Sequence, residues 1–238
     1  MNKLIKNMML IIISICIVYS IFTISFQKST LENIDFYLNR YEVQGSDSEL
    51  ELSKEDARIV TVSMIEYMTG QRDDMQVEAT VLGETRNFFT EREISHFLDV
   101  RNIMMPIIQI KNTALVIISV LLAVIVGLCV VIKEKYNLKE ILANYCKIQM
   151  IVIGTAVIIF ILLGIVCAID FNSIFLLFHE LSFDNDNWLL NPIYDKVIVL
   201  MPTSFFIAAL TNILVWFAIG LVTWFIGCIV VRKLVIRR

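Results

Sequence analysis

The chain has 238 residues, of which 58% are hydrophobic and 18% are charged, and its formal net charge at pH 7 is −3. The apolar residues gather in long uncharged runs and the mean hydropathy is +0.75, which excludes an ordinary soluble domain and indicates an integral membrane protein. The slightly acidic balance gives no reason to expect a nucleic-acid partner.

The first uncharged run, residues 8–26, is predicted to anchor the N-terminus in the membrane. Lys3 and Lys6 precede it, as basic residues precede the core of a cleavable signal peptide. This run is longer than a usual signal core and lacks an Ala-x-Ala-like exit, so we expect an uncleaved signal anchor.

Three further uncharged runs follow, at 113–132, 148–169 and roughly 205–231. About 20 residues at a rise of about 1.5 Å cross a hydrocarbon core of about 30 Å, so all four runs can span a membrane. The sequence therefore predicts an α-helical integral membrane protein with four transmembrane helices. Its predicted parts are a cytoplasmic N-terminus with the first helix (1–26), an extracytoplasmic cap (27–112), the second helix (113–132), a cytoplasmic loop (133–147), the third helix (148–169), a second outer segment (170–202), the fourth helix (203–231) and a cytoplasmic tail (232–238).

The distribution of Lys and Arg predicts that both termini are cytoplasmic, because basic residues near helix ends are retained on that side. The inner segments hold ten of the 20 basic residues and only two of the 23 acidic ones, Glu134 and Glu140. The basic inner rim suits anionic lipid headgroups. The inner basic residues are Lys3, Lys6, Lys133, Lys135, Lys139, Lys147, Arg232, Lys233, Arg237 and Arg238.

The five cysteines all fall in predicted spans or in the cytoplasmic loop. The outer segments therefore offer neither a disulfide framework nor a thiol nucleophile. These residues are Cys16, Cys129, Cys146, Cys167 and Cys228.

The first outer segment is predicted to form a small α/β cap that leans on the membrane. Residues 48–52 and 75–81 alternate between polar and apolar side chains, as strands do, and Gly83 is expected to end the second strand. Capping-box spacing at 53–56 predicts a helix that ends near Gly70.

A second capping box, at 90–93, predicts a helix that carries His96. His96 and Asp99 are three residues apart and so share a face of this helix, on which Asp99 can orient the imidazole. Phe97 and Arg101 share another face.

The second outer segment is short and apolar in patches, so we expect it to stay at the bilayer. Residues 174–178 are too few to span and predict a re-entrant or interfacial helix directly before His179, with Trp188 at headgroup depth. Asn191 followed by Pro192 predicts an N-cap and a first helical position, opening a short helix that Pro202 ends or kinks.

Histidine occurs only twice, and both His96 and His179 lie in the outer segments. An imidazole with a pKa of about 6.5 both accepts and donates a proton near neutral pH, so these residues are the first catalytic candidates. Either histidine can instead be an interfacial polar residue. Zinc binding is a weaker alternative, because the sequence has no His-Glu-x-x-His or paired-cysteine motif, and we expect no metal or other cofactor.

Other polar residues of the outer segments have both a functional and a structural interpretation. The amides of Asn185, Asn187 and Asn191 can polarise an ester carbonyl or act as loop and cap residues. Arg101 can pair with a neighbouring acid. The acids Glu180, Asp184 and Asp186 can be solvated loop carboxylates.

Two motifs give the chain a resemblance to a known family. The first reads Glu93-Ile-Ser-His-Phe-Leu-Asp-Val-Arg101, and the second reads Phe178-His-Glu-Leu-Ser-Phe-Asp-Asn-Asp-Asn-Trp-Leu-Leu-Asn-Pro192, followed by Asp195 and Met201-Pro202-Thr-Ser-Phe-Phe206. Together with four spans around two outer segments, they resemble the bacterial lipoprotein intramolecular transacylase family (Lit) over nearly the whole chain. Phe97 stands where many relatives have methionine.

The resemblance implies an acyltransferase of the bacterial plasma membrane that works without a cofactor. Its partners would be membrane lipids and lipoproteins whose N-terminal cysteine carries a diacylglyceryl group and a free α-amine. The sn-2 acyl chain would move to that amine and leave a lyso-form lipoprotein. His96 and His179 would be general base and acid in an order left open, Asp99 would orient a ring, and Asn185 or Arg101 would stabilise the oxyanion.

Several alternatives remain at this stage. Ser95, Ser182 or Thr90 can carry a transient acyl group. A phospholipid-dependent N-acyltransferase, a metal-dependent membrane hydrolase and a non-catalytic membrane sensor fit the same residues. The oligomeric state, the acyl-chain preference and the identity of the lipoprotein substrates are left open.

Overall fold

A computed structural model describes residues 3–131 and 137–236 of the chain. The chain divides into two compact units. Unit 1 comprises Met1–Ser25, Gln109–Ile165 and Leu214–Arg238, and unit 2 comprises Phe26–Ile108 and Val166–Ile213. Five residues that entered the orientation argument, Lys133, Glu134, Lys135, Arg237 and Arg238, lie outside the described residues.

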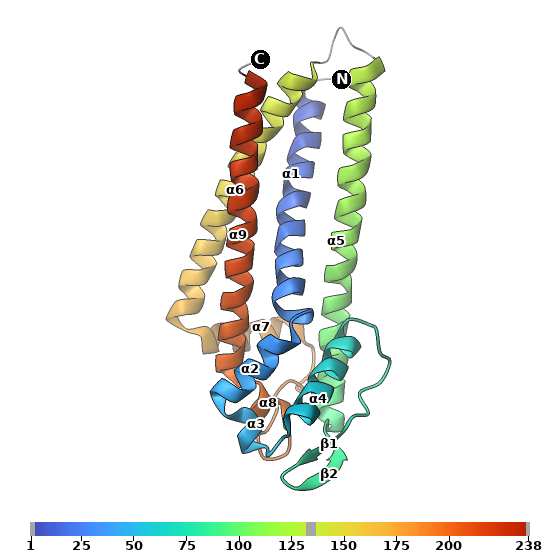
Figure 1. Ribbon diagram of the computed structural model, residues 1–238, viewed down its shortest axis with the longest axis vertical. Helices are drawn as coiled ribbons and strands as arrows, with labels where there is room; N and C mark the ends of the chain where they lie inside the picture. The colour runs from blue at the N-terminus through green and yellow to red at the C-terminus, as the bar shows by residue number, and fades with distance from the viewer. Residues whose placement is uncertain (1–2, 132–136, 237–238) are drawn as a thin grey trace. The chain divides into compact units, whose positions relative to one another are not determined.

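Four helices are long and apolar enough to cross a membrane, as the sequence predicts. They are α1 (Lys3–Phe26), α5 (Glu91–Val131), α6 (Leu138–Ile169) and α9 (Thr203–Ile236) (Figure 1). α5 runs unbroken through Pro106, so no break in the helix marks the predicted boundary between cap and span after residue 112. The uncharged part of α5 begins after Lys111, and the charged part before it belongs mostly to unit 2.

Unit 1 consists of the long apolar helices packed on one another. Leu10, Ile13, Ile125 and Ile141 form one buried cluster, while most other apolar side chains of these helices stay exposed, as lipid-facing side chains do. Within this unit the starts of α1 and α6 and the ends of α5 and α9 lie at the same end (Figure 1). That arrangement fits the predicted topology, although the side of the membrane stays a prediction.

Unit 2 holds the shorter elements around one buried core. They are a π-helical turn, η1 (Gln27–Leu31), the helices α2 (Ile34–Gln44), α3 (Ser46–Glu49), α4 (Lys54–Met68), α7 (Phe171–Ser182) and α8 (Val197–Leu200), and the strands β1 (Glu78–Val81) and β2 (Glu84–Asn87). The N-cap predicted for α4 is confirmed, because the Ser53 hydroxyl accepts the Asp56 N–H at 3.0 Å. Gly70 follows the helix with a φ of +75°, which favours glycine.

One predicted strand is wrong and the other is shorter than expected. Residues 48–52 form the end of α3 and a turn, in which Leu52 N–H donates to the Asp47 carbonyl at 2.8 Å. Leu50 and Leu52 are both buried by this turn, which explains an alternating pattern without a strand.

The second predicted strand, β1, begins only at Glu78. It pairs with β2, which was not predicted, through a two-residue turn at Leu82 and Gly83 with φ values of 53° and 78°.

The helix predicted to begin at Asn191 and Pro192 is also wrong. The Asn191 side-chain oxygen accepts the Ile193 N–H at 3.0 Å, and its backbone carbonyl accepts the Tyr194 and Asp195 N–H groups. These hydrogen bonds form a local turn, in which the backbone N–H groups of residues 193–195 are already paired in a non-helical arrangement. α8 therefore starts only at Val197. Pro202 follows the end of α8 as expected. α7 forms the predicted short helix, while its depth in the bilayer stays a prediction.

Candidate active site

One face of α7 carries two phenylalanine rings and the His179 imidazole. Asp170 caps the helix, since its carboxylate accepts the Ser173 N–H at 3.1 Å and the Ser173 hydroxyl at 2.6 Å. Phe171, Phe175 and His179 follow at four-residue spacing and therefore share a face. The Phe175 ring centroid lies 5.9 Å from that of Phe171 and 4.3 Å from that of His179.

The first turn of α5 places the second histidine. The Thr90 N–H donates to the Glu93 carboxylate at 2.7 Å, and the Glu93 N–H donates to the Thr90 hydroxyl at 3.2 Å, so the predicted capping box is confirmed. His96 lies one turn later. Its ring centroid is 5.8 Å from that of His179, with 34° between the ring planes, so the fold brings the two predicted catalytic residues together.

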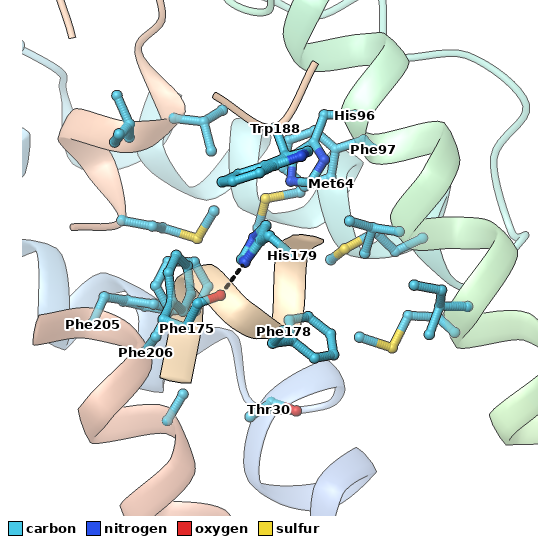
Figure 2. A pocket seen from close by; sticks show the side chains of 18 of the residues that line it. Thr30, Met64, His96, Phe97, Phe175, Phe178, His179, Trp188, Phe205 and Phe206 are labelled. Carbon is cyan, nitrogen blue, oxygen red and sulfur yellow. Dashed lines mark hydrogen bonds between the residues drawn. The ribbon is translucent and has the colours of Figure 1, made fainter. Parts of the chain in front are cut away.

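A cavity of about 370 Å³ in unit 2 opens beside both rings. Figure 2 shows His96 and His179 between the aromatic side chains that line it. The Phe183 ring centroid lies 5.0 Å from His96 and 5.5 Å from His179, and the Trp188 ring lies 5.2 Å from His179. The lining is almost wholly apolar and therefore suits an acyl chain beside two proton-transfer groups.

Both imidazoles are buried, with 9% of His96 and 8% of His179 exposed, and burial favours their neutral forms. Burial, with a smaller effect of the charge on His179, lowers the pKa of His96 to about 4, although the Asp99 carboxylate raises it. Burial also lowers the pKa of His179, against the hydrogen bond to Phe175, which raises it. Both rings therefore favour the neutral form near neutral pH, in which each has one nitrogen with a free lone pair.

The two rings differ in hydrogen bonding. Nδ1 of His179 lies 2.7 Å from the Phe175 carbonyl oxygen, marked by the dashed line in Figure 2. A carbonyl oxygen only accepts, so Nδ1 carries the proton and the lone pair of the neutral ring is on Nε2. Nδ1 of His96 is buried and has no partner among the described residues.

Asp99 and Asn185, both predicted site residues, contact each other. The Asn185 amide donates to the Asp99 carboxylate at 2.9 Å, and no hydrogen bond in the described part of the chain joins Asp99 to either imidazole. Two further hydrogen bonds hold the same segment, the loop between α7 and α8, against α5. Asn187 donates to the Ser95 hydroxyl at 2.9 Å and Arg92 donates to the Asp186 carbonyl at 2.7 Å. Residues 92, 95 and 99 share a face of α5, which thus holds the loop that carries Trp188.

Arg101 is held within unit 2 away from the cavity lining. Its guanidinium donates to the Arg72 carbonyl at 3.0 Å, lies 3.5 Å from the Asp73 carboxylate and stacks 5.0 Å from the Tyr67 ring centroid. Arg101, Asp99 and Asn185 are absent from the cavity lining within the described residues, whereas both histidines are part of it. The roles predicted for them, orienting an imidazole for Asp99 and stabilising the oxyanion for Asn185 or Arg101, stay predictions.

The remaining polar candidates are three hydroxyl residues and three acids. Thr90 donates its hydroxyl to Asp195 at 2.8 Å, and the Ser95 hydroxyl accepts from Asn187. Ser182 is the last residue of α7. The acids Glu180, Asp184 and Asp186 are exposed. Among residues 3–131 and 137–236, no three His, Cys, Asp or Glu side chains converge as a metal-binding group.

Sequence reasoning missed two features of the site. The aromatic lining includes Phe175, Phe183 and Trp188, and the four-residue spacing of Phe171, Phe175 and His179 was a signal for part of it. Glu93 and Asp195 are 0% and 3% exposed, although both are carboxylates in predicted outer segments. The spacing of Thr90 and Glu93 indicated a cap but not this burial.

Comparisons with known proteins match this chain in sequence and in fold. A family model described as lipoprotein intramolecular transacylase Lit matches residues 9–206. A solved structure of the membrane-integral lipoprotein intramolecular transacylase Lit from Bacillus cereus is similar at a TM-score of 0.74 and 20% identity, covering 99% of this chain and 98% of that one. Two structures of that protein with a histidine replaced by alanine or by arginine are similar at TM-scores of 0.67, each at 20% identity; they cover 98% of this chain and 94% and 92% of theirs. No curated protein sequence matches.

Proposed function

Because the chain belongs to the lipoprotein intramolecular transacylase (Lit) family, we propose that it moves the sn-2 acyl chain of a diacylglyceryl-cysteine to the α-amine of that cysteine. The product is an N-acyl, S-monoacylglyceryl lipoprotein. The observation that carries the proposal is the pair of buried imidazoles, 5.8 Å apart, beside one apolar cavity. The substrate carries its amine and its ester on one cysteine, and the acyl chain of the ester is apolar, as the cavity lining is.

His179 is the general base in this proposal. An unperturbed α-amine has a pKa of about 7.7–8.0 and is mostly protonated at neutral pH, so it must lose a proton before it attacks the ester carbonyl carbon. The donation from Nδ1 of His179 to the Phe175 carbonyl leaves Nε2 with the free lone pair that this step needs.

His96 completes the proton transfer. As the N–C bond forms and the bond between the acyl carbon and the sn-2 oxygen breaks, one proton must pass from the amine to that glycerol oxygen. His179 releases the ammonium proton to water, and neutral His96 takes the second nitrogen proton as the amine adds to the carbonyl carbon. Because the pKa of His96 lies near 4, the imidazolium that forms is a strong donor and gives this proton to the sn-2 oxygen as its bond to the acyl carbon breaks. The protein returns to its starting protonation state, and no covalent acyl-enzyme is needed.

Positioning of the substrate lowers the activation free energy further. The nucleophile and the ester belong to one molecule, and holding them aligned can contribute about 7–11 kcal/mol. Asp99 and Asn185 serve this purpose by fixing the loop of Trp188. Arg101 stabilises unit 2 through its contacts with Arg72, Asp73 and Tyr67. The site belongs to the extracytoplasmic face of the bacterial plasma membrane, with both termini in the cytoplasm, as the basic residues predict.

The test is a reconstituted reaction. The protein is placed in vesicles of unlabelled phospholipid with a diacylated lipopeptide whose sn-2 chain carries an isotope label. Mass spectrometry should find a lyso product of unchanged total mass with the label on the amine. A triacylated product would instead identify a phospholipid-dependent N-acyltransferase, and free labelled fatty acid would identify a hydrolase. Exposed Glu180→Gln is the control variant that should keep wild-type turnover.

A further inference from the structure

Two buried carboxylates, Glu93 and Asp195, form a closed hydrogen-bonded bridge between distant parts of unit 2. One Glu93 oxygen accepts the Thr90 N–H at 2.7 Å, and the other accepts the Val197 N–H at 2.6 Å. One Asp195 oxygen accepts the Thr90 hydroxyl at 2.8 Å, and the other accepts the Asn191 N–H at 2.7 Å. All four carboxylate oxygens therefore have a donor.

Such a bridge needs an explanation, because burying carboxylates costs free energy unless they are well paired. Desolvation, together with the neighbouring Asp195 carboxylate, raises the pKa of Glu93 above its ordinary value, although the hydrogen bonds from Thr90 and Val197 lower it. A capping box alone would use only the Glu93 oxygen that accepts from Thr90. The second oxygen instead reaches Val197, 104 positions further along the chain. Glu93 thus joins the first turn of α5 to the start of α8.

The bridge lies next to the reacting groups on both of its sides. On α5, Glu93 precedes His96 by one helical turn. On the other side, the bridged residues 191–197 lie between Leu190 and Ile198, and Leu190, Val197 and Ile198 all line the cavity. Any shift of this segment relative to α5 would move the cavity wall relative to the His96 ring.

We propose that Glu93 and Asp195 are positioning residues for acyl transfer, which hold His96 in register with the cavity wall built by residues 188–198. This inference rests on the function proposed above. The two residues touch neither histidine by a hydrogen bond in the described structure and act through the backbone that they tie together. A misplacement of about 1 Å in such a site can cost roughly 10²-fold in rate.

The geometry makes the two carboxylates unequal. Both Glu93 oxygens face backbone N–H groups, which only donate, so Glu93→Gln must set an amide NH₂ against one of them. One Asp195 oxygen faces the Thr90 hydroxyl, which can accept as well as donate. Asp195→Asn can therefore keep its oxygen on Asn191 and turn its NH₂ toward Thr90. Glu93→Asp keeps the charge but is too short to reach both N–H groups.

The experiment measures kcat and KM of each folded variant with the labelled diacylated lipopeptide, together with the apparent Tm. Glu93→Gln and Glu93→Asp should each lose roughly 10- to 10²-fold in kcat with KM changed by less than about threefold. The kcat of Asp195→Asn should stay within about threefold of the wild-type value. The kcat of Asp195→Ala should fall as much as that of the Glu93 variants. Glu91→Gln is the matched control on the same helical turn, because Glu91 is exposed and should change nothing.

Three results would overturn the inference. Wild-type kcat in the folded fraction of Glu93→Gln, with only a lower Tm, would make the bridge merely structural. Recovery of kcat in Glu93→Asp would show that charge rather than reach matters. Equal losses in Asp195→Asn and Glu93→Gln would contradict the assigned donors. Parallel assays of His96→Ala and His179→Ala separate this failure from failure of the proposed function, since their retained activity would refute the latter.

Discussion

Nδ1 of His179 lies 2.7 Å from the carbonyl oxygen of Phe175, the residue one turn earlier in α7. This single contact fixes the tautomer of a buried imidazole, because the oxygen has no proton to give. The role of base proposed for His179 therefore rests on this contact as well as on its residue type.

The first prediction concerns this contact. His179→Asn keeps an amide donor near the position of Nδ1 but has no equivalent of Nε2. Since the loss of one general acid or base typically costs roughly 10²- to 10⁴-fold, kcat for lipopeptide transacylation should fall by that factor while the variant stays folded. Circular dichroism and turnover on the same sample check this. Normal turnover in a folded His179→Asn protein would remove His179 from the mechanism.

The second prediction concerns pH and stability. His96 has a pKa of about 4 in the fold, whereas an unfolded histidine titrates near about 6.5. Between these values the unfolded chain binds the proton and the folded chain does not, so stability must fall as the pH is lowered through this window. His96→Phe, which suits the aromatic surroundings, removes that dependence. The apparent Tm of wild type should drop relative to His96→Phe from about pH 7 to about pH 4.

Parallel Tm curves for the two proteins would contradict the second prediction. His179, whose pKa is also lowered by burial, remains in both proteins and contributes in the same direction. Comparing the two proteins therefore isolates His96.

The third prediction concerns Phe183, whose ring contacts both histidine rings. Phe183→Ala would open space beside them and admit water, which competes with the amine for the acyl group. We expect lower transacylation together with release of free fatty acid, and a His96 pKa that rises toward its ordinary value as desolvation is relieved. Product analysis by mass spectrometry and the pH dependence of kcat/KM test both parts. Leu181→Ala, at a side chain that is 79% exposed, is the control.

The fourth prediction concerns topology. In a variant without the five native cysteines, single cysteines at Glu84 and Asp184 should react with an impermeant thiol reagent in intact cells. A cysteine at Lys139 should react only after the membrane is permeabilised. All three positions are exposed in the structure. The reverse labelling pattern would refute the orientation, and the cysteine-free protein should keep its transacylase activity because the mechanism uses no thiol.

The sequence by itself determined the features that depend on neighbouring residues. Uncharged runs long enough to cross a bilayer predicted the four long helices, since their length and composition alone decide whether they can span. Capping boxes at Ser53 and Thr90 predicted the starts of α4 and α5, because the bonds involved join residues three apart. Local patterns failed where another local arrangement satisfied the same groups, as in the turns at residues 48–52 and at Asn191.

Only the tertiary structure decided what surrounds the two histidines. The motifs identified His96 and His179 as a pair, but the 5.8 Å between their rings depends on packing α5 against α7 within unit 2. The burial that lowers their pKa values comes from Phe183 and other aromatic side chains brought in by that packing. The second hydrogen bond of Glu93, to Val197, likewise joins residues that no local spacing relates. Burial and long-range hydrogen bonds are properties of the folded chain, so a sequence pattern marks the residues but not their environment.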